Sequence, residues 1–249
     1  SASDSRCMFA VVRTLRYVLV DVFTNRHLEG NALAVFTRAT GLDSATMQAI
    51  AREMNLSETT FVCPPTRGGH AEVRIFTPRA EVPFAGHPLL GTAFVLGGPV
   101  QAEVLQLETG VGLVPVRLER EGAKIAFGWM LQPTAQPITP PPAAEVLSAL
   151  GVPDALATVA AYDNGIRHVV VTVPEPAVVA ALTPEFARLA VFGLMTFAVV
   201  ARVSGADAST CVVKARVFAP AAGIPEDPAT GSAAGAIAIH VRGLGWLRD

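Results

Sequence analysis

Cysteine is scarce in this sequence, and its scarcity excludes two kinds of site. The 249 residues include three cysteines, Cys7, Cys63 and Cys211, which are widely spaced and form no Cys-x-x-Cys pair. An odd number without such a pair argues against a disulfide framework and against a zinc site. We interpret these cysteines as packing thiols. The histidines other than His87 show no ligand spacing with one another or with the cysteines, so we expect no metal.

Charge is also scarce. Charged residues make up 16% of the chain, and the formal net charge is -2. Without basic clusters or interleaved aromatic residues, the sequence gives no reason to expect a nucleic acid or an anionic membrane as a partner. Gly97-Gly98 lacks the Lys-Ser/Thr continuation of a phosphate loop, and no Gly-x-Gly-x-x-Gly follows a strand, so nucleotide binding has no support. No Gly-x-Ser-x-Gly elbow indicates a hydrolase nucleophile.

No apolar run is long enough to cross a bilayer. The longest uncharged one, residues 189–201, contains Gly193 and Thr196, and we predict a buried strand or helix segment there. Residues 1–16 lack the charged, apolar and small-residue regions of a secretory signal, which makes a cytoplasmic location the default expectation. Hydrophobic residues nevertheless make up 51% of the chain, and the mean hydropathy is +0.44, so we expect additional apolar surface to be buried between lobes or subunits.

The pattern of apolar residues predicts alternating strands and helices. Asp43 is placed to cap a helix in which apolar residues recur at helical spacing from Met47 to Met54, and the pattern gives way at Asn55. The expected strands are 17–23, 32–36, 58–62, 71–76, 104–108, 113–118, 167–173, 197–203 and 212–218. The other expected helices are 88–96, 143–150 and one that begins at Gly231.

A proline-rich segment divides the chain. Residues 133–142 carry five prolines, a composition typical of a linker. We therefore predict an N-terminal lobe over residues 1–132 and a C-terminal lobe over residues 143–249. Each lobe would be a mixed sheet with a helix against it, which makes the fold class α+β.

A short repeat relates the two predicted lobes. Arg, Phe, Pro, Ala and Pro recur in register between residues 74–83 and residues 216–225. Beyond each copy, Gly86-His87 and Gly231-Ser232 open an apolar helix. Two units of strand, glycine turn and helix predict a duplicated domain. Chance similarity in a chain rich in alanine and proline is the alternative.

The second of these helix starts, residues 223–236, combines a carboxylate, a hydroxyl and a glycine turn. The first backbone amides after Thr230 should point outward unpaired, with the positive end of the helix dipole behind them. This arrangement predicts an anion pocket. The alternative is an ordinary capped helix, with Thr230 or Ser232 as the cap.

Three titratable residues are candidates for chemistry. Glu58 enters a β-prone run, where burial would raise its pKa and let it take and return a proton near neutral pH, although position alone favours a solvent-facing residue. His87 at a helix start would stay neutral and donate to a substrate oxygen, or it would be a packing or capping residue. Asp227 should be extended because Pro228 follows it. Asp227 could orient a substrate amine or His87, but capping of the helix is the safer interpretation.

Five motifs follow one another along the chain. They are Asp21-Val22-Phe23, Gly30-Asn31, Asn55-Leu56-Ser57-Glu58-Thr59-Thr60-Phe61, Pro83-Phe84-Ala85-Gly86-His87-Pro88 and Glu226-Asp227-Pro228-Ala229-Thr230-Gly231-Ser232-Ala233. Their order and spacing resemble the phenazine-biosynthesis PhzF-like isomerase family over nearly the whole chain. The resemblance implies a fold similar to diaminopimelate epimerase, with two pseudo-symmetric lobes. Each lobe would be a rolled mixed sheet around a central helix, with the active site in the cleft between the lobes.

The resemblance also implies a mechanism that needs no cofactor. The matching glutamate is the family's proton shuttle, so Glu58 would take a proton from an activated carbon of a small carboxylate substrate and return it elsewhere on the same molecule. His87, Asp227 and Ser232 match residues that position the substrate and assist the transfer. The residues expected to bind the substrate are Asn31, Gly86, Thr230 and Gly231. The expected assembly is a homodimer.

Two alternatives and two departures accompany the resemblance. No cysteine lies near the two helix starts, which argues against a two-thiol racemase. Two alternatives stay open: a racemase that uses one carboxylate and one histidine, and a binding or scaffold protein without chemistry. Gly30-Asn31-Ala32 stands where the family commonly has Gly-Asn-Pro, which should loosen a turn. Family members usually continue with further strands, whereas this sequence stops at Asp249, so we expect a second lobe that is incomplete or completed by a partner subunit.

Overall fold

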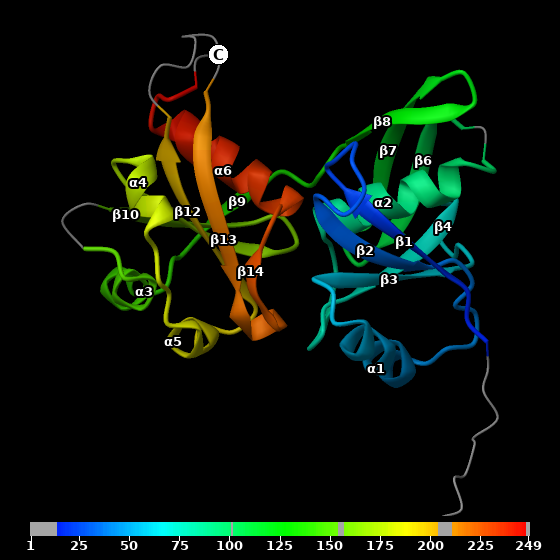
Figure 1. Ribbon diagram of the computed structural model, residues 1–249, viewed down its shortest axis with the longest axis horizontal. Coiled ribbons are helices and arrows are strands. Elements are labelled where there is room, and N and C mark those ends of the chain that lie inside the picture. The colour runs from blue at the N-terminus through cyan, green and yellow to red at the C-terminus, as the bar shows by residue number, and fades with distance from the viewer. Residues whose placement is uncertain (1–13, 101, 154–156, 204–210, 248–249) are drawn as a thin grey trace, which may run out of the picture.

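The computed structural model describes residues 14–100, 102–153, 157–203 and 211–247, and it contains two separate β-sheets (Figure 1). The first sheet has eight strands in the order β1-β2-β3-β4-β6-β7-β8, with β5 paired to β4. They are β1 (Tyr17–Val22), β2 (Asn31–Phe36), β3 (Glu58–Cys63), β4 (Ala71–Phe76), β5 (Glu81–Val82), β6 (Val104–Thr109), β7 (Gly112–Glu121) and β8 (Lys124–Met130). The predicted α+β class is confirmed.

The second sheet has six strands in the order β14-β13-β12-β11-β10-β9. They are β9 (Gln136–Ile138), β10 (Thr158–Asp163), β11 (Arg167–Thr172), β12 (Met195–Arg202), β13 (Val213–Ala219) and β14 (Ile224–Asp227). The α-helices are α1 (Ser44–Met54), α2 (Gly86–Gly97), α3 (Ala143–Leu150), α4 (Pro176–Ala180), α5 (Phe186–Ala190) and α6 (Gly231–Gly243), and a 3-10 turn, η2, covers Pro220–Ala222.

Helices cover both faces of the first sheet around β3. The sheet curls around α2, which contacts β1, β2, β3, β6, β7 and β8, while α1 packs on the opposite face (Figure 1). Phe61 packs with Phe36 and Phe76 in the α1 layer. Thr60, on the other face, hydrogen-bonds Thr92 of α2 at 2.9 Å. Because β3 is buried on both faces, the alternation of its polar and apolar residues does not distinguish a solvent-facing side from a core-facing side.

The ends of α1 follow their sequence signals. The Asp43 carboxylate accepts a hydrogen bond from the backbone N–H of Thr46 at 2.7 Å, which satisfies one of the free amides of the first turn. Asn55 adopts the left-handed backbone conformation with φ 51°, and its N–H donates to the carbonyl of Ala51. The predicted cap and the predicted end are both confirmed.

The second sheet repeats the connectivity of the first. Strands β10 to β14 followed by α6 match β1 to β5 followed by α2, with antiparallel, parallel, antiparallel and antiparallel pairings in the same order. Arg74 pairs with Glu81 at 2.6 Å and lies over the phenyl ring two residues later. Arg216 pairs with Glu226 at 2.7 Å and also lies over the ring two residues later. The repeat seen in the sequence is therefore a repeat of structure.

Several details differ from the sequence-based expectations. The elements that were not expected are strands β5, β8, β9, β10 and β14 and helices α4 and α5. Residues 189–201 are neither one strand nor one helix, because a turn through Gly193 with φ 77° separates α5 from β12. The proline-rich segment contains β9, which pairs with β10, and the lobe boundaries stay a prediction. Cys63 and Cys211 are half-buried, and Cys7 lies outside the described residues. No helix in the described ranges is both long and apolar enough to span a membrane.

A buried carboxylate holds the loop between β3 and β4. Glu108 accepts hydrogen bonds from the backbone N–H groups of Thr66, Arg67 and Gly69 at 2.6 to 2.8 Å. Burial alone would raise the pKa of Glu108, but these donors, together with the Thr66 hydroxyl, lower the pKa to about 2. The ionised carboxylate is therefore the form that stabilises the loop.

We expect Glu108→Gln to melt at a lower temperature than the wild type at pH 7, because an amide group would face three amide donors. Folding lowers the pKa of Glu108, so the stability that this carboxylate contributes is present above its ordinary pKa of 4.5 and is lost as the pH falls toward 2. The difference in melting temperature between the wild type and Glu108→Gln should therefore shrink from pH 5 to pH 2. Thermal melts across this range measure it. Exposed Glu103→Gln is the control; equal melting temperatures for the two variants at pH 7 would contradict the prediction.

Candidate active site

Two helix starts meet between the lobes. α2 and α6 are in contact, and neither of their N-cap residues, Ala85 and Thr230, makes a side-chain hydrogen bond to its helix. A Cβ atom on Gly86 would lie 2.7 Å from the backbone nitrogen of Ser232, so only glycine allows this approach. A Cβ atom added to Gly231, on the facing helix α6, would lie 3.5 Å from Cα of Gly86. Both helices thus direct their positive ends toward one region.

The hydroxyl of Thr230 does not cap α6. It donates to Oδ2 of Asp227 at 2.5 Å. The alternative in which Thr230 caps α6 is therefore wrong, and Ser232 is already the second residue of the helix. The first amides of α6 keep their capacity to bind an anion.

Glu58, the first residue of β3, lies inside the protein with 9% of its surface exposed. Burial, and to a smaller extent the charge of Asp227, raises the pKa of Glu58 well above its ordinary value of 4.5. The solvent-facing interpretation, which position alone favoured, is wrong because β3 has no solvent face at this point. A carboxyl group with a raised pKa can exchange a proton with a bound molecule near neutral pH.

His87, the second residue of α2, faces Glu58. Burial lowers the pKa of His87 to about 4, although the charge of Asp227 and the backbone of Ala32 act in the opposite direction, so the ring is neutral at pH 7. Its Nε2 atom lies 3.6 Å from Oε2 of Glu58. Neither atom has a hydrogen-bond partner among the described residues. Both atoms therefore keep the capacity to hydrogen-bond a third group.

Asn31, the first residue of β2, ties Asp227 to the first lobe. Its Nδ2 donates to Oδ1 of Asp227 at 2.6 Å and to the carbonyl of Ala229 at 3.1 Å, and it lies 3.3 Å from Nδ1 of His87. Ser57 donates to the same Asp227 oxygen at 3.4 Å. Within the described chain the hydrogen bonds to this carboxylate come from side chains, so Asp227 orients its neighbours instead of capping α6.

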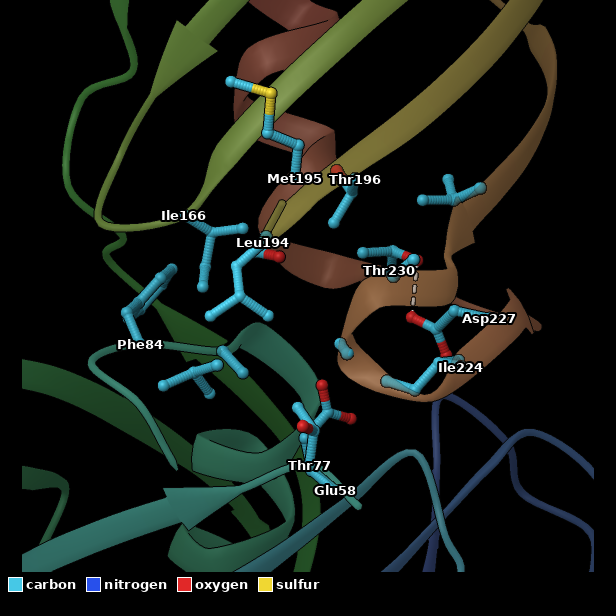
Figure 2. Close-up of a pocket in the computed structure, with 16 residues that line it drawn as sticks. Glu58, Thr77, Phe84, Ile166, Leu194, Met195, Thr196, Ile224, Asp227 and Thr230 are labelled. Atoms are coloured by element: carbon cyan, nitrogen blue, oxygen red, sulfur yellow. Dashed lines mark hydrogen bonds between the residues drawn. The ribbon is translucent and has the colours of Figure 1, made fainter. Parts of the chain in front are cut away.

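A pocket lies between the two sheets beside these residues (Figure 2). Figure 2 shows the Glu58 carboxylate pointing into it and the hydrogen bond between Thr230 and Asp227 at its side. Of the sequence-predicted site residues, four line the pocket: Glu58, Asp227, Thr230 and Ser232. The other four contact these: Asn31, Gly86, His87 and Gly231. The described residues include no group of three His, Cys, Asp or Glu side chains placed to hold a metal.

Two supporting residues were missed in the sequence. Ser57 donates to Asp227, and Asn164, which is 2% exposed, donates to the backbone carbonyl of Ser232 at 2.9 Å. Asn164-Gly165 is recognisable as a turn signal. Nothing local in the sequence connects that turn to a helix start 68 residues later.

Comparisons with known sequences identify the family of this chain. A family model described as phenazine biosynthesis-like protein (PhzC-PhzF) matches residues 20–247. The chain is 46% identical over 231 residues to the trans-2,3-dihydro-3-hydroxyanthranilate isomerase of Pseudomonas fluorescens, covering 93% of this chain and 81% of that protein. It is 45% identical over 228 residues to the enzyme of the same name from Pseudomonas aeruginosa, covering 91% and 79%.

Solved structures give the same result. A protein named as a predicted epimerase of Pseudomonas aeruginosa has a TM-score of 0.76 at 28% identity, covering 94% of this chain and 83% of that chain. A PhzF family protein of Bacillus anthracis has a TM-score of 0.72 at 25% identity, covering 88% and 77%. A hydroxyproline epimerase of Agrobacterium vitis, at 12% identity, a TM-score of 0.55 and 86% and 75% coverage, shares the fold alone. The chain therefore belongs to the PhzC-PhzF family of phenazine biosynthesis-like proteins, and it is an isomerase with an epimerase-like fold.

Proposed function

We propose that this isomerase uses no cofactor and moves a proton within a small carboxylate-bearing substrate, with Glu58 as both acid and base. The observation that carries the proposal is the buried, unpartnered pair of Glu58 and His87 beside the pocket. Their environments push the two pKa values in opposite directions, which is a common arrangement of acid and base groups in enzymes.

The proton transfer balances within one substrate molecule. Ionised Glu58 takes a proton from a carbon next to a conjugated carboxylate system, and the electron pair of the broken C–H bond moves into that system. Glu58 is then a carboxylic acid and returns the proton to a different carbon, which shifts the double bond. No electrons leave the substrate, so the step needs no redox partner. Neutral His87, 3.6 Å from Glu58, is placed to hydrogen-bond the reacting region.

The opposed helix starts support the charge that develops. Removal of the proton builds negative charge on the substrate, and the amides that follow Ala85 and Thr230 are fixed donors in a buried region. Asp227 and Ser232 line the pocket and would position the substrate, with Asn31 holding Asp227 in place. Binding of the substrate carboxylate at these amides is the role we propose for Gly86 and Gly231.

A cyclic amino acid with a hydroxyl group is the substrate class we propose. The relatives named above are isomerases of trans-2,3-dihydro-3-hydroxyanthranilate, which carries a carboxylate, an amine and a hydroxyl on one ring. Apolar walls from Val82, Phe84 and Ile166 suit such a ring. The homodimer and the cytoplasmic location expected from the sequence stay predictions.

Turnover of trans-2,3-dihydro-3-hydroxyanthranilate in deuterated water tests the function. We expect an isomerised product with deuterium at the carbon that receives the proton, to the extent that the Glu58 carboxyl, once it has taken the substrate proton, exchanges it with solvent before returning it within the same turnover. Proton and deuterium NMR of the product locate the label. Inversion at a single carbon would instead identify a racemase, and absence of both turnover and exchange across a panel of ring acids would leave a binding protein.

We expect kcat/KM to rise with pH along an acid limb whose apparent pKa lies well above 4.5. Burial raises the pKa of Glu58, so the ionised base is scarce until the pH passes that raised value. His87, with a pKa near 4, stays neutral over this limb. The second cause of the shift is Asp227, so Asp227→Asn should move the limb to lower pH whatever its effect on the maximum rate. A limb at 4.5 or below in the wild type would contradict the assignment of Glu58 as the base.

A further inference from the structure

Phe23 belongs to the Asp21-Val22-Phe23 motif and has no part in the mechanism proposed above. The residue directly follows β1, and the loop that it begins lies beside the start of α6 (Figure 1). A Cβ atom on Gly231 would lie 2.9 Å from Cζ of Phe23, which is too close for a real contact. The next nearest atoms, Cα of Gly86 and the backbone nitrogen of His87, would lie at 3.5 Å, an ordinary contact distance. The Phe23 ring is therefore the group that leaves no room for a side chain at Gly231.

The backbone of Phe23 is held in an unusual conformation. Its φ of 64° lies in the left-handed region, which bulky residues rarely adopt and which persists only where the surrounding structure imposes it. Here the neck of the loop imposes it. The backbone N–H of Leu28 donates to Oδ2 of Asp21 at 2.9 Å, and Gly30, with φ 87°, lies too close to the Val22 carbonyl for a Cβ atom to fit. The closed neck keeps the Phe23 side chain directed toward α6.

The other end of the same loop holds the strand that precedes α6. Asn31 pairs with Val22 across the neck, and its side chain donates to Asp227 at 2.6 Å. The loop therefore contacts β14 through Asn31 and α6 through Phe23. The residues that line the pocket in the described part of the chain do not include Phe23. An effect of Phe23 on the reaction would therefore pass through α6 and not through contact with the substrate.

We infer that Phe23 is a positioning residue: its ring fixes how closely the start of α6 approaches Gly86 and His87, and it thereby holds the first amides of α6 in place for the substrate. The inference rests on the proposed function, in which these amides face the substrate carboxylate and the charge that develops on it. Phe23 is 51% exposed, so burial in the core does not account for its position. Fixed donors stabilise developing charge because they need no reorganisation, so a shift of the α6 start would lower the rate.

Phe23→Leu removes the Cζ atom and keeps an apolar side chain. We expect kcat/KM for trans-2,3-dihydro-3-hydroxyanthranilate to fall roughly 10-fold, because the start of α6 loses the group against which it packs. Phe127→Leu is the matched control: Phe127 is 50% exposed, lies in β8 and packs against Trp129. This control should keep the wild-type kcat/KM. A wild-type kcat/KM in Phe23→Leu would overturn the inference.

Gly231→Ala tests the contact from the other side. Gly231 is not one of the glycines with positive φ, so alanine suits its backbone, and the added Cβ meets only the Phe23 ring at close range. Either the ring or α6 must then move, and we expect kcat/KM to fall roughly 10-fold. Phe23→Leu frees the space that this Cβ needs, so the double variant should be at least about 3-fold more active than Gly231→Ala, whereas losses from unrelated packing defects would multiply. A double variant no more active than Gly231→Ala would overturn the inference.

Melting temperatures of the wild type, the two single variants and the double variant test the contact without a substrate. We expect the shift caused by Gly231→Ala to be more favourable in Phe23→Leu than in the wild type, because alanine favours a helix over glycine once the ring no longer opposes it. Equal shifts in the two backgrounds would overturn the inference. If the wild type does not turn over the substrate, the proposed function is at fault, and the melting temperatures alone then support or overturn the contact between Phe23 and Gly231.

Discussion

Glu58→Gln is expected to lower kcat for the proton transfer by roughly 10²- to 10⁴-fold, the usual contribution of a general acid or base. Glutamine has nearly the same shape as glutamic acid but neither takes nor returns a proton. Because glutamine fills the same buried space next to His87, we expect the packing of β3 against α2 to be kept. Product formation and deuterium uptake should fall together, because both pass through the same carboxyl group.

Stability measurements separate lost chemistry from lost structure. Folding raises the pKa of Glu58, so its buried, protonated form gives stability that is fully present below the ordinary pKa of 4.5 and is lost as the pH rises through the raised value. Glutamine does not ionise, so we expect Glu58→Gln to gain in melting temperature relative to the wild type as the pH increases. Glu53→Gln, on the exposed face of α1, is the matched control and should change neither property. Wild-type deuterium exchange in Glu58→Gln would remove Glu58 from the mechanism.

Gly86→Ala is expected to lower kcat/KM by about 10²-fold, because the added methyl group must push the two helix starts apart. Its Cβ would lie 2.7 Å from the backbone nitrogen of Ser232 and 2.8 Å from the carbonyl carbon of Gly231. Both neighbours are backbone atoms at the start of α6, so neither can rotate away. A displacement of about 1 Å at the helix starts would move the amides relative to the bound substrate, and a misplacement of that size can cost about 10²-fold in rate.

The same substitution near the other end of the helix provides the control. A Cβ on Gly98, just after α2, would meet its nearest neighbour, the Val95 carbonyl oxygen, at 3.8 Å, an ordinary contact. Gly98→Ala should therefore keep wild-type activity, while Gly86→Ala should also lose about 1–3 kcal/mol of unfolding free energy from overpacking. Equal kcat/KM values for the two variants would show that close approach of the helices is not needed.

The local features of this fold were readable from the sequence. Asp43 and Asn55 bound α1 because capping and left-handed endings depend on single residues. The turn, helix and repeat around Gly86 and Gly231 were also visible, since glycine is needed wherever two backbones approach. Edge strand β8 was missed although most of its residues, KIAFGWM, are apolar, because Gly128 interrupts the apolar run and glycine is depleted in strands.

The long-range features were not readable. The burial of Glu58 depends on α1 and α2 covering opposite faces of β3, which the sequence of β3 does not report. The contact between Asn31 and Asp227 joins residues 196 positions apart, and the contact between Phe23 and Gly231 joins a loop of the first sheet to a helix packed on the second. Each is a property of how the two sheets meet.

The meeting of α2 and α6 start to start also has an energetic consequence for the empty enzyme. Each helix end carries about half a positive charge, so the two ends repel one another when nothing lies between them. A carboxylate bound at these amides, as proposed above, would act as a counter-ion shared by the two lobes. Ligand binding and the stability of the contact between the lobes are then thermodynamically linked. A ligand at 100 times its dissociation constant should add about 2.7 kcal/mol to the free energy of unfolding. If the substrate carboxylate binds as proposed, it would also hold the two lobes together.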